Sequence, residues 1–106
     1  MQTSPPAFPP AVIDMGTNTF HLLIATWPGG SRPHVLARDK VFVRIGQGGI
    51  SDGTLTPAAF ERTLEALRRF RVQLDAHGVP PERALVTATS AVRSAKNGKE
   101  LVAAIR

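Results

Sequence analysis

The stretch Ile13–Ala25, IDMGTNTFHLLIA, decides how the chain begins to fold. The apolar runs at 11–13 and 20–25 predict two neighbouring buried strands, and the link DMGTNT predicts a tight turn between them. A plain hairpin needs only a turn pair such as Asn-Gly. This turn carries a carboxylate, a glycine and three hydrogen-bonding side chains. The surplus of polar groups raises the question of a ligand.

Length and composition limit the classes of protein to consider. A chain of 106 residues is one small domain or a piece of one. The net charge of +5, from 13 Lys and Arg against 8 acidic residues, is compatible with anionic partners, but codon bias toward Arg is the stronger explanation of it. Basic residues are not interleaved with aromatic ones, so we expect no specific nucleic-acid partner. The chain has no Cys, which excludes disulfides and thiolate metal sites.

The N-terminal residues do not resemble a signal peptide. Residues 1–10, MQTSPPAFPP, carry no positive charge and no apolar core, and four prolines predict a disordered or extended lead-in. No stretch approaches the roughly 20 apolar residues of a membrane helix. We therefore expect a soluble, cytoplasmic protein with no membrane partner, organised as a lead over 1–10 and one lobe over 11–106.

The rest of the sequence predicts the order β-β-β-α-β-α. The three early strands are expected at 11–13, 20–27 and 34–45, followed by a Gly-rich connection over 46–57. Thr56 as N-cap and Pro57 as the first helical residue predict a helix that ends at His77-Gly78. Its apolar residues Phe60, Leu64, Leu67, Phe70 and Leu74 share one face.

A fourth strand and a second helix follow the long helix. The apolar run Ala84–Thr89 predicts a strand buried on both faces, added in parallel through the helix. The segment KELVAAIR predicts a helix, and because the helical pattern runs to Arg106 we expect the chain to be a fragment. The pattern is that of an α/β fold.

The polar turn suits a phosphate and a metal. Gly16 lets a ligand approach the backbone closely, and Thr17, Asn18 and Thr19 offer hydroxyl, amide and N–H groups to phosphate oxygens. Asp14 is a hard oxygen ligand that suits Mg²⁺, directly or through water. The alternative is that these side chains only satisfy the backbone of the turn.

A second polar stretch, VTATSAVRSA at 86–95, follows the fourth strand. Thr89 and Ser90 lie just beyond its carboxyl end, where open α/β sheets bind ligands. Arg93 is close enough to turn its guanidinium back over that edge and bind phosphate oxygens. A solvated arginine on a short helix is the alternative.

These stretches together resemble the exopolyphosphatase and guanosine pentaphosphate phosphatase family. AVIDMGTNTFHLLIA resembles its opening, VRIGQGGISDGTLTPAAFERTLEALRRF its next segment, and VTATSAVRSAKNG its third. The similarity covers residues 11–106 in order. The hairpin alone is shared with the wider actin, Hsp70 and sugar-kinase superfamily, whereas ATSAVR is more specific.

The resemblance implies a fold, an activity and roles for residues. It implies the first of two ribonuclease-H-like, actin-like lobes, and Mg²⁺-dependent hydrolysis of the terminal phosphoanhydride of polyphosphate or guanosine pentaphosphate. By resemblance, Asp14 helps to hold the metal, the hairpin residues Gly16, Thr17, Asn18 and Thr19 line the phosphate, and Arg93 binds it. Many relatives have Ser at the positions of Thr17 and Thr19, which keeps the hydroxyl group.

One departure from the family limits what residues 1–106 can do. Relatives continue with a segment resembling SGEEEA, whose glutamate is the general base, and a Gly-rich loop resembling GGGS; neither occurs before Arg106. We therefore expect no catalytic residue and no hydrolysis within 1–106. A kinase-like member of the superfamily and a non-catalytic phosphate- or nucleotide-sensing module are the other readings. An isolated lobe is expected to self-associate, for example as a homodimer, through its exposed face.

Three other features favour a structural explanation. His21, on an apolar strand, is expected to be a packed core residue rather than a ligand. The arginines at 68, 69 and 71 are expected to form a solvated helix face, with a secondary role in guiding a polyanion as the alternative. The glycines of RIGQGG form no dinucleotide fingerprint, but they could place backbone N–H groups near the site.

Overall fold

A computed structural model describes residues 10–28, 32–89, 92–93 and 95–105. The expected disorder of residues 1–9 lies outside the described residues. Pro10 is described, and its carbonyl accepts a hydrogen bond from the N–H of Ala25 at 3.0 Å. Among the described helices, none is long and apolar enough to cross a membrane.

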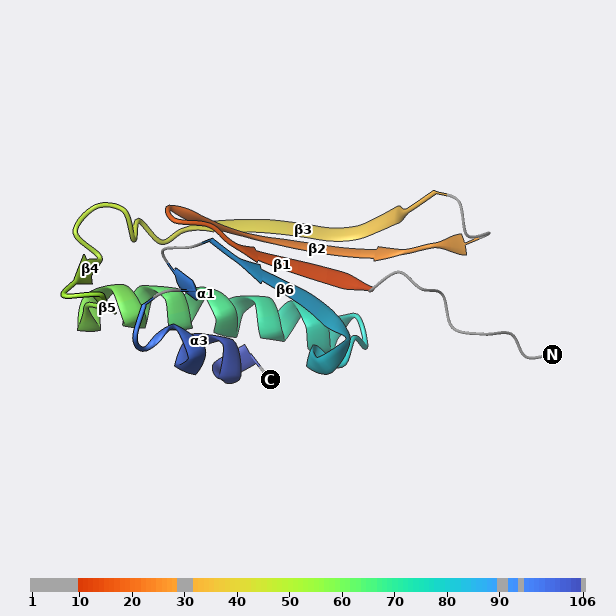
Figure 1. The fold of residues 1–106 in the computed structure, drawn as a ribbon. Coiled ribbons are helices and arrows are strands. Elements are labelled where there is room, and N and C mark those ends of the chain that lie inside the picture. Colours follow the sequence, from red (N-terminus) through yellow and green to blue (C-terminus); the bar gives the residue numbers. More distant parts are fainter. Residues whose placement is uncertain (1–9, 29–31, 90–91, 94, 106) are drawn as a thin grey trace.

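The chain folds as a four-stranded mixed sheet covered on one face by two helices (Figure 1). The elements in chain order are β1 (Ala11–Met15), β2 (Thr19–Thr26), β3 (His34–Phe42), β4 (Ile50–Ser51), β5 (Thr54–Leu55), α1 (Pro57–Ala76), the 3₁₀ turn η2 (Pro81–Arg83), β6 (Ala84–Ala88) and α3 (Gly98–Ile105). The sheet has the order β3-β2-β1-β6, and the expected α/β fold class is confirmed.

The strand directions follow from the connections. Two short connections make β1, β2 and β3 antiparallel neighbours, whereas α1 carries the chain back so that β6 pairs in parallel with β1. In this register Asp14 of β1 lies between His21 of β2 and Thr87 of β6. All three therefore share the face of the sheet that the helices do not cover.

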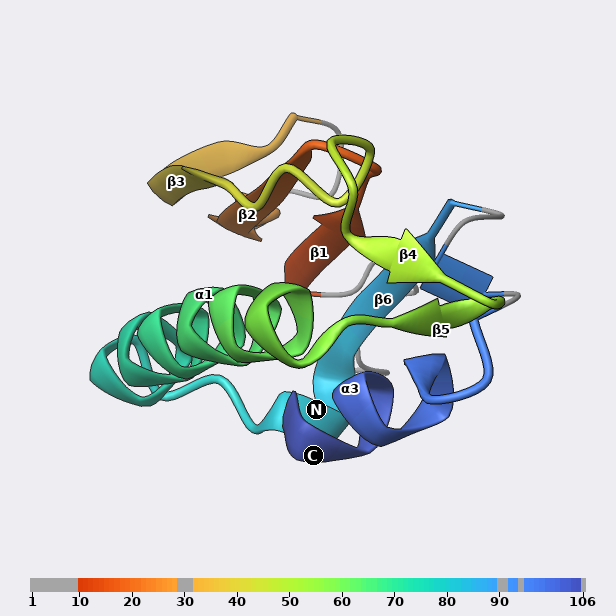
Figure 2. The same cartoon turned by 90° about the vertical axis from the view of Figure 1, so that its left-hand side faces the viewer.

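The core lies between the sheet and α1, and Figure 2 shows α1 and α3 together on that side. Alternate residues of β1 and β2 point inward, so one face of each strand is fully buried. The inward residues are Ala11, Ile13, Met15, Phe20, Leu22 and Ile24. From α1, the residues Leu67, Phe70 and Leu74 pack against them.

Helix α1 begins and ends at the residues that the sequence predicts. The Oγ1 of Thr56 accepts the N–H of Ala59 at 3.2 Å, and Pro57 occupies the first turn. Gly78 follows the end with a φ of +68°, a conformation that glycine adopts without strain. Phe60 and Leu64 are half-buried, because Ala59, Thr63 and Ala66 occupy the innermost positions of the helix.

Two strand predictions were wrong. β3 ends at Phe42 rather than at Ile45, because the backbone N–H groups of residues 43–46 turn to the β1–β2 hairpin instead of a neighbouring strand. β6 is buried on one face only, and Leu85 is 49% exposed, since no helix covers the outer face of the sheet in the described part of the chain. The sequence also gave no sign of the small β4–β5 hairpin inside the Gly-rich connection.

Candidate phosphate-binding site

The β1–β2 hairpin closes in a turn that only glycine fits at its first position. The N–H of Gly16 donates to the carbonyl of Thr19 at 3.1 Å. A Cβ atom at Gly16 would lie 2.7 Å from that carbonyl oxygen, a distance that would force the turn apart. Gly16 is therefore required by the hairpin itself, whatever the hairpin binds.

Some polar groups of the β1–β2 hairpin form hydrogen bonds that hold the loop after β3. The carbonyl of Asn18 accepts the N–H groups of Val43 and Arg44, and the carbonyl of Thr17 accepts those of Ile45 and Gly46. The Oδ1 of Asn18 also accepts the N–H of Gly46, at 3.2 Å. For this oxygen the structural explanation holds: it satisfies backbone groups of the loop.

The donors of the hairpin are left available. The N–H groups of Thr17 and Asn18 donate to no other residue in the part of the chain that the structure describes. The Oγ1 of Thr17 lies 3.4 Å from the Oγ1 of Thr89, which follows β6. Two adjacent free N–H groups beside two hydroxyls form an arrangement that suits phosphate oxygens.

Asp14 sits at the same edge of the sheet with its carboxylate exposed. The Oγ1 of Thr87 donates to its Oδ1 at 2.8 Å, which orients the carboxylate and leaves the second oxygen available. Sequence reasoning did not single out Thr87. The signal that points to Thr87 is the parallel pairing of β1 with β6, because this pairing sets Thr87 beside Asp14.

Arg93 returns to the carboxyl end of β6, as the sequence predicts. Its N–H donates to the carbonyl of Thr89 at 2.9 Å, and its Nη1 donates to the carbonyl of Ala88 at 3.3 Å. Ala88 pairs with Met15, the residue before Gly16, so the guanidinium reaches the strand end from which the hairpin starts. The structure thus brings Arg93, Thr89, Asp14 and the hairpin to one edge. Ser90 lies outside the described residues.

The donor set at this edge fits Mg²⁺ only in its usual water-rich form. No group of three or more His, Cys, Asp or Glu side chains that could hold a metal occurs among the described residues. Mg²⁺ commonly uses one or two carboxylates and completes its coordination with waters and substrate phosphates. The exposed carboxylate of Asp14, beside the polar turn of the β1–β2 hairpin, is compatible with that mode of binding.

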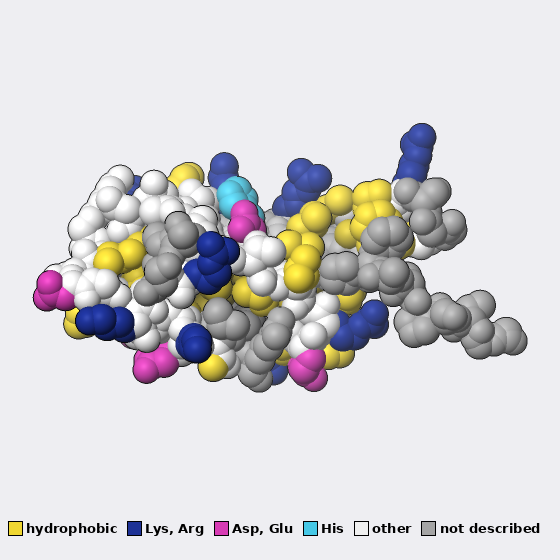
Figure 3. All heavy atoms as spheres, viewed as in Figure 1, with side chains coloured by type: hydrophobic (Ala, Val, Ile, Leu, Met, Phe, Trp, Pro, Cys, Tyr) yellow, Lys and Arg dark blue, Asp and Glu magenta, His cyan; other side chains and the backbone are white. Residues whose placement is uncertain are grey.

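His21 is not a core residue, contrary to the sequence prediction. It is exposed, because strand alternation places it on the uncovered face, opposite its buried neighbours Phe20 and Leu22. In the register it pairs with Asp14 on one side and Lys40 on the other. Figure 3 shows a histidine, an acidic and several basic side chains gathered on this face of the molecule.

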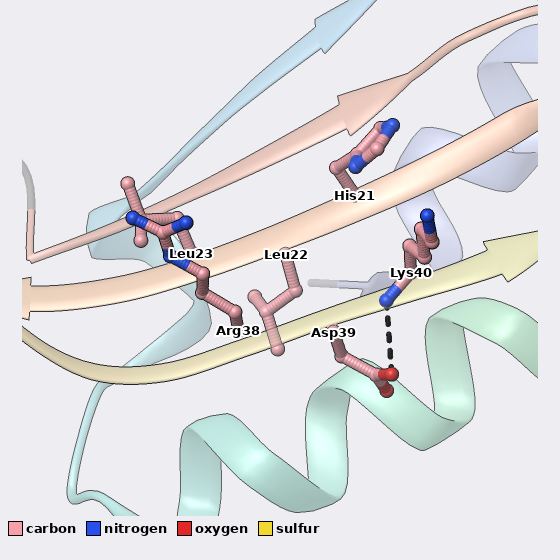
Figure 4. A pocket seen from close by; sticks show the side chains of 6 residues that line it. All are labelled: His21, Leu22, Leu23, Arg38, Asp39 and Lys40. Atoms are coloured by element: carbon pink, nitrogen blue, oxygen red, sulfur yellow. Dashed lines mark hydrogen bonds between the residues drawn. The ribbon is translucent and has the colours of Figure 1, made fainter.

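A hollow of about 600 Å³ lies beside His21 and Lys40, and residues of β2 and β3 line it (Figure 4). Its lining residues are His21, Leu22, Leu23, Arg38, Asp39 and Lys40. His21 and Lys40 point to one side of the sheet, and Asp39 points to the other, toward α1. The hollow is away from the hairpin donors, so we do not assign the phosphate to it.

Three arginines of α1 form ion pairs with carboxylates. Arg68 contacts Glu61 and Glu65, Arg69 contacts Asp39, and Arg71 contacts Asp75. Three of these four ion pairs join residues of the same exposed helix surface. The prediction of a solvated helix face is therefore correct for Arg68 and Arg71, while Arg69 links the helix to β3.

Comparison with known proteins agrees with this fold. The model of the Ppx/GppA phosphatase family matches residues 23–106. An exopolyphosphatase from Cytophaga hutchinsonii is 48% identical, with a TM-score of 0.77 over 90% of this chain and 30% of its own length. A Ppx/GppA family member from Aquifex aeolicus is 26% identical, with a TM-score of 0.71 over 86% of this chain and 29% of its own.

Both matches concern one lobe. The chain spans about 30% of the length of these two proteins, and its mixed sheet with helices on one face corresponds to the actin-like lobe of the family. The expected ribonuclease-H-like fold is thereby confirmed. The chain belongs to the Ppx/GppA phosphatase family.

Proposed function

We propose that this chain is the phosphate-binding lobe of a phosphoanhydride hydrolase that acts on the terminal phosphate of inorganic polyphosphate or guanosine pentaphosphate. The observation that supports the proposal is that two kinds of phosphate-binding group, backbone N–H donors and a guanidinium, lie at the same end of the sheet. The free N–H groups of Thr17 and Asn18 come from the hairpin, and the guanidinium of Arg93 comes from the segment after β6.

The residues have distinct roles in this proposal. The N–H groups and the hydroxyls of Thr17 and Thr19 bind phosphate oxygens, and Gly16 keeps the turn tight enough for the phosphate to reach them. Arg93 neutralises the charge of the terminal phosphate with a two-point contact. Asp14 would hold Mg²⁺, directly or through water, and the ion when bound would supply positive charge that offsets the charge of the substrate phosphates.

Hydrolysis also needs a general base, and none of the residues assigned above to the phosphate or the metal is available as one. A water nucleophile requires a positioned base, and the carboxylate of Asp14 is assigned to the metal. In the family that this chain resembles, the base is a glutamate of a segment like SGEEEA, which does not occur in residues 1–106. We propose that residues 1–106 bind phosphate and Mg²⁺ but do not release phosphate.

The binding role can be tested on the chain itself. Isothermal titration with tripolyphosphate in the presence of Mg²⁺ should give an affinity that falls about tenfold in Arg93→Gln, because one charge-assisted contact is lost. Arg93→Lys should fall less, since it keeps the charge and loses the planar fork. Arg83→Gln, an exposed arginine in η2, is the matched control and should bind as the unaltered chain does. Equal affinity in Arg93→Gln would refute this assignment.

The hydrolytic role can be tested in a chimera. Residues 11–106 would replace the equivalent segment of the Cytophaga hutchinsonii exopolyphosphatase, whose 48% identity favours correct packing. Mg²⁺-dependent phosphate release from polyphosphate, lost in Arg93→Gln, is the expected result. A folded chimera that binds tripolyphosphate but releases no phosphate would favour the sensing-module reading. Transfer of phosphate from ATP to an acceptor would favour the kinase-like reading.

A further inference from the structure

The segment before α3 contains a chemically labile dipeptide, Asn97-Gly98. In an Asn-Gly pair the backbone nitrogen of the glycine can attack the Cγ of the asparagine, because glycine has no side chain to obstruct the approach. The chain has two asparagines, and the other, Asn18, is followed by Thr19, whose branched side chain hinders the same attack. Asn97 is therefore the favoured position for this reaction.

The fold requires both members of the pair. The side chain of Asn97 holds the β4–β5 hairpin, because its Oδ1 accepts the N–H of Leu55 at 2.9 Å and its Nδ2 donates to the carbonyl of Leu55 at 3.1 Å. Gly98 is buried, and a Cβ atom at this position would collide with the carbonyl oxygen of Val92. The labile dipeptide thus occupies two positions where substitution would disturb the structure.

In the closed structure the reacting groups are engaged in other contacts. Both polar atoms of the Asn97 amide bond to Leu55, and the N–H of Gly98 donates to the carbonyl of Ala95 at 3.0 Å. The carbonyl of Asn97 accepts the N–H of Glu100 at 3.2 Å, which fixes the backbone around the pair at the start of α3. Attack on the Cγ of Asn97 therefore requires some of these contacts to break first.

The β4–β5 hairpin that holds Asn97 is the part of the fold most easily opened. β4 and β5 contribute two residues each, and the residues of their turn, Asp52 and Gly53, are exposed. A strand pair of this length is marginal alone, so it opens more readily than the main sheet or α1. Figure 2 shows β5 beside the segment that leads into α3. Opening of the hairpin releases the amide of Asn97 without unfolding the core.

We propose that Asn97 is a site of spontaneous deamidation, and that the reaction is limited by opening of the β4–β5 hairpin. The nitrogen of Gly98 forms a bond to the Cγ of Asn97, the C–N bond of the side-chain amide breaks, and ammonia leaves with the proton of Gly98. Water then opens the cyclic imide at either of its carbonyl carbons, which yields aspartate or isoaspartate. Water is the only co-reactant, and the inference does not depend on the proposed function.

The product of the reaction keeps the hairpin open. An aspartate loses the donor to the carbonyl of Leu55 and sets a negative charge against that oxygen, and an isoaspartate also adds a methylene to the backbone. The hairpin is bonded to the Gly-rich loop, because the N–H of Thr56 donates to the carbonyl of Gly49 at 2.8 Å. Deamidation of Asn97 thus makes a reversible opening permanent and loosens the connection between β3 and α1.

The reaction can be followed in the unaltered chain during incubation at mildly alkaline pH. Cleavage after glutamate releases residues 83–100, and mass spectrometry of this fragment measures the conversion of the Asn97 amide to a carboxylate. Isoaspartate formed at Asp52-Gly53 lies outside the fragment and is not counted. We expect Asn97 to deamidate faster than Asn18, and about tenfold faster again in urea that unfolds the chain, because the closed hairpin no longer protects it. Reaction no faster than at Asn18, or equally fast with and without urea, would overturn the inference.

Two glycine variants test whether hairpin opening limits the reaction. Gly53→Ala strains the turn between β4 and β5, where φ is +73°, and should speed deamidation of Asn97 about tenfold by raising the open population. Gly78→Ala is the matched control, because Gly78 has a φ of +68° but follows the other end of α1, and it should leave the rate unchanged. Circular dichroism confirms that each variant keeps the fold. Equal rates in the two variants would contradict control by the hairpin.

The effect of the product is measured on the aged chain. Amide hydrogen exchange of residues 50–55 in the deamidated chain should be about tenfold faster than in the fresh chain, while that of α1 stays the same. Unchanged exchange at 50–55 after complete deamidation of Asn97 would overturn the claim that the product holds the hairpin open.

Discussion

At the scale of single residues, Asp39 fastens the edge of the sheet to α1. Its side chain is only 12% exposed. Arg69 donates to both of its carboxylate oxygens, from Nε to Oδ2 at 2.6 Å and from Nη2 to Oδ1 at 2.7 Å. Gln73 adds a third contact at 2.7 Å, and the N–H of Lys40 a fourth at 2.9 Å. Burial alone would raise the pKa of Asp39, but these donors and the charge of Arg69 outweigh it and lower the pKa below 3.8.

The lowered pKa of Asp39 predicts a pH-dependent contribution to stability. Because the folded pKa lies below the unfolded value, the contribution is present above about pH 4 and is lost as the pH falls through the folded pKa. Asp39→Asn should lower the free energy of unfolding by about 1–2 kcal/mol at pH 7, a range reduced because Arg69 is largely exposed. The difference between variant and unaltered chain should shrink as the pH falls below 4, as measured by urea unfolding.

Glu65→Gln is the matched control for that experiment. Glu65 pairs with Arg68 on the exposed surface of α1, where the two side chains are 70% and 59% exposed. An exposed pair of this kind contributes little, so the unfolding curves should stay within about 0.5 kcal/mol of the unaltered chain at every pH. A loss in Glu65→Gln as large as that in Asp39→Asn would contradict the special role of Asp39.

Single residues could be predicted from the sequence where the relevant partners are close along the chain. The position of the hairpin residues 16–19 and of Arg93 at strand ends could be predicted because a strand end and a polar stretch stand side by side in the sequence. His21 was misjudged because an apolar run hides which of its members face outward. Arg44 and Asp39 gave no signal, because their partners Asn18, Arg62 and Arg69 are brought near only by the fold.

At the scale of elements, Asn97 ties the β4–β5 hairpin to the segment that precedes α3. Its Oδ1 accepts the N–H of Leu55 at 2.9 Å, and its Nδ2 donates to the carbonyl of Leu55 at 3.1 Å. Beside it, the N–H of Lys96 donates to the carbonyl of Gly53 at 2.8 Å. A two-residue strand pair is marginal on its own, so these bonds supply much of its stability.

Replacing Asn97 by Asp should loosen this hairpin alone. The variant Asn97→Asp loses the donor to the carbonyl of Leu55 and sets a carboxylate against that oxygen. Amide hydrogen exchange of residues 50–55 should become about tenfold faster, while that of α1 stays unchanged. Lys99→Gln changes the net charge by the same amount at an exposed neighbouring position and should leave the exchange unaltered. Equal acceleration in both variants would contradict the clamp.

Elements could be predicted where one pattern dominates. α1 was located to the residue because an N-cap, a proline and a C-terminal glycine frame an apolar stripe. The β4–β5 hairpin was missed because its strands have two residues each and depend on Asn97, 42 positions away from Leu55. β6 was thought to be buried on both faces because its apolar content does not record which faces the other elements cover.

At the scale of the whole molecule, pairing decides which positive charges are available to a ligand. The net charge of +5 does not spread evenly, because Arg68, Arg69 and Arg71 along α1 are matched by carboxylates. Arg93 and Arg44 make no ion pair with described residues, and both lie near the β1–β2 hairpin. We therefore expect the arginines near the hairpin to contribute more to attracting a polyanion than the paired arginines along α1 do.

The dependence of binding on salt measures how many of these charges a polyanion meets. Polyphosphate resembles nucleic acid in its dense negative charge, so each cation that neutralises a phosphate adds about one to the slope of log affinity against log salt. Arg93→Gln and Arg44→Asn should each reduce the slope for long-chain polyphosphate by about one. Arg83→Gln, in η2 beyond the far end of α1, should leave it unchanged. If all three variants reduced the slope equally, diffuse attraction by the net charge would replace defined contacts of the polyanion with Arg93 and Arg44 near the hairpin.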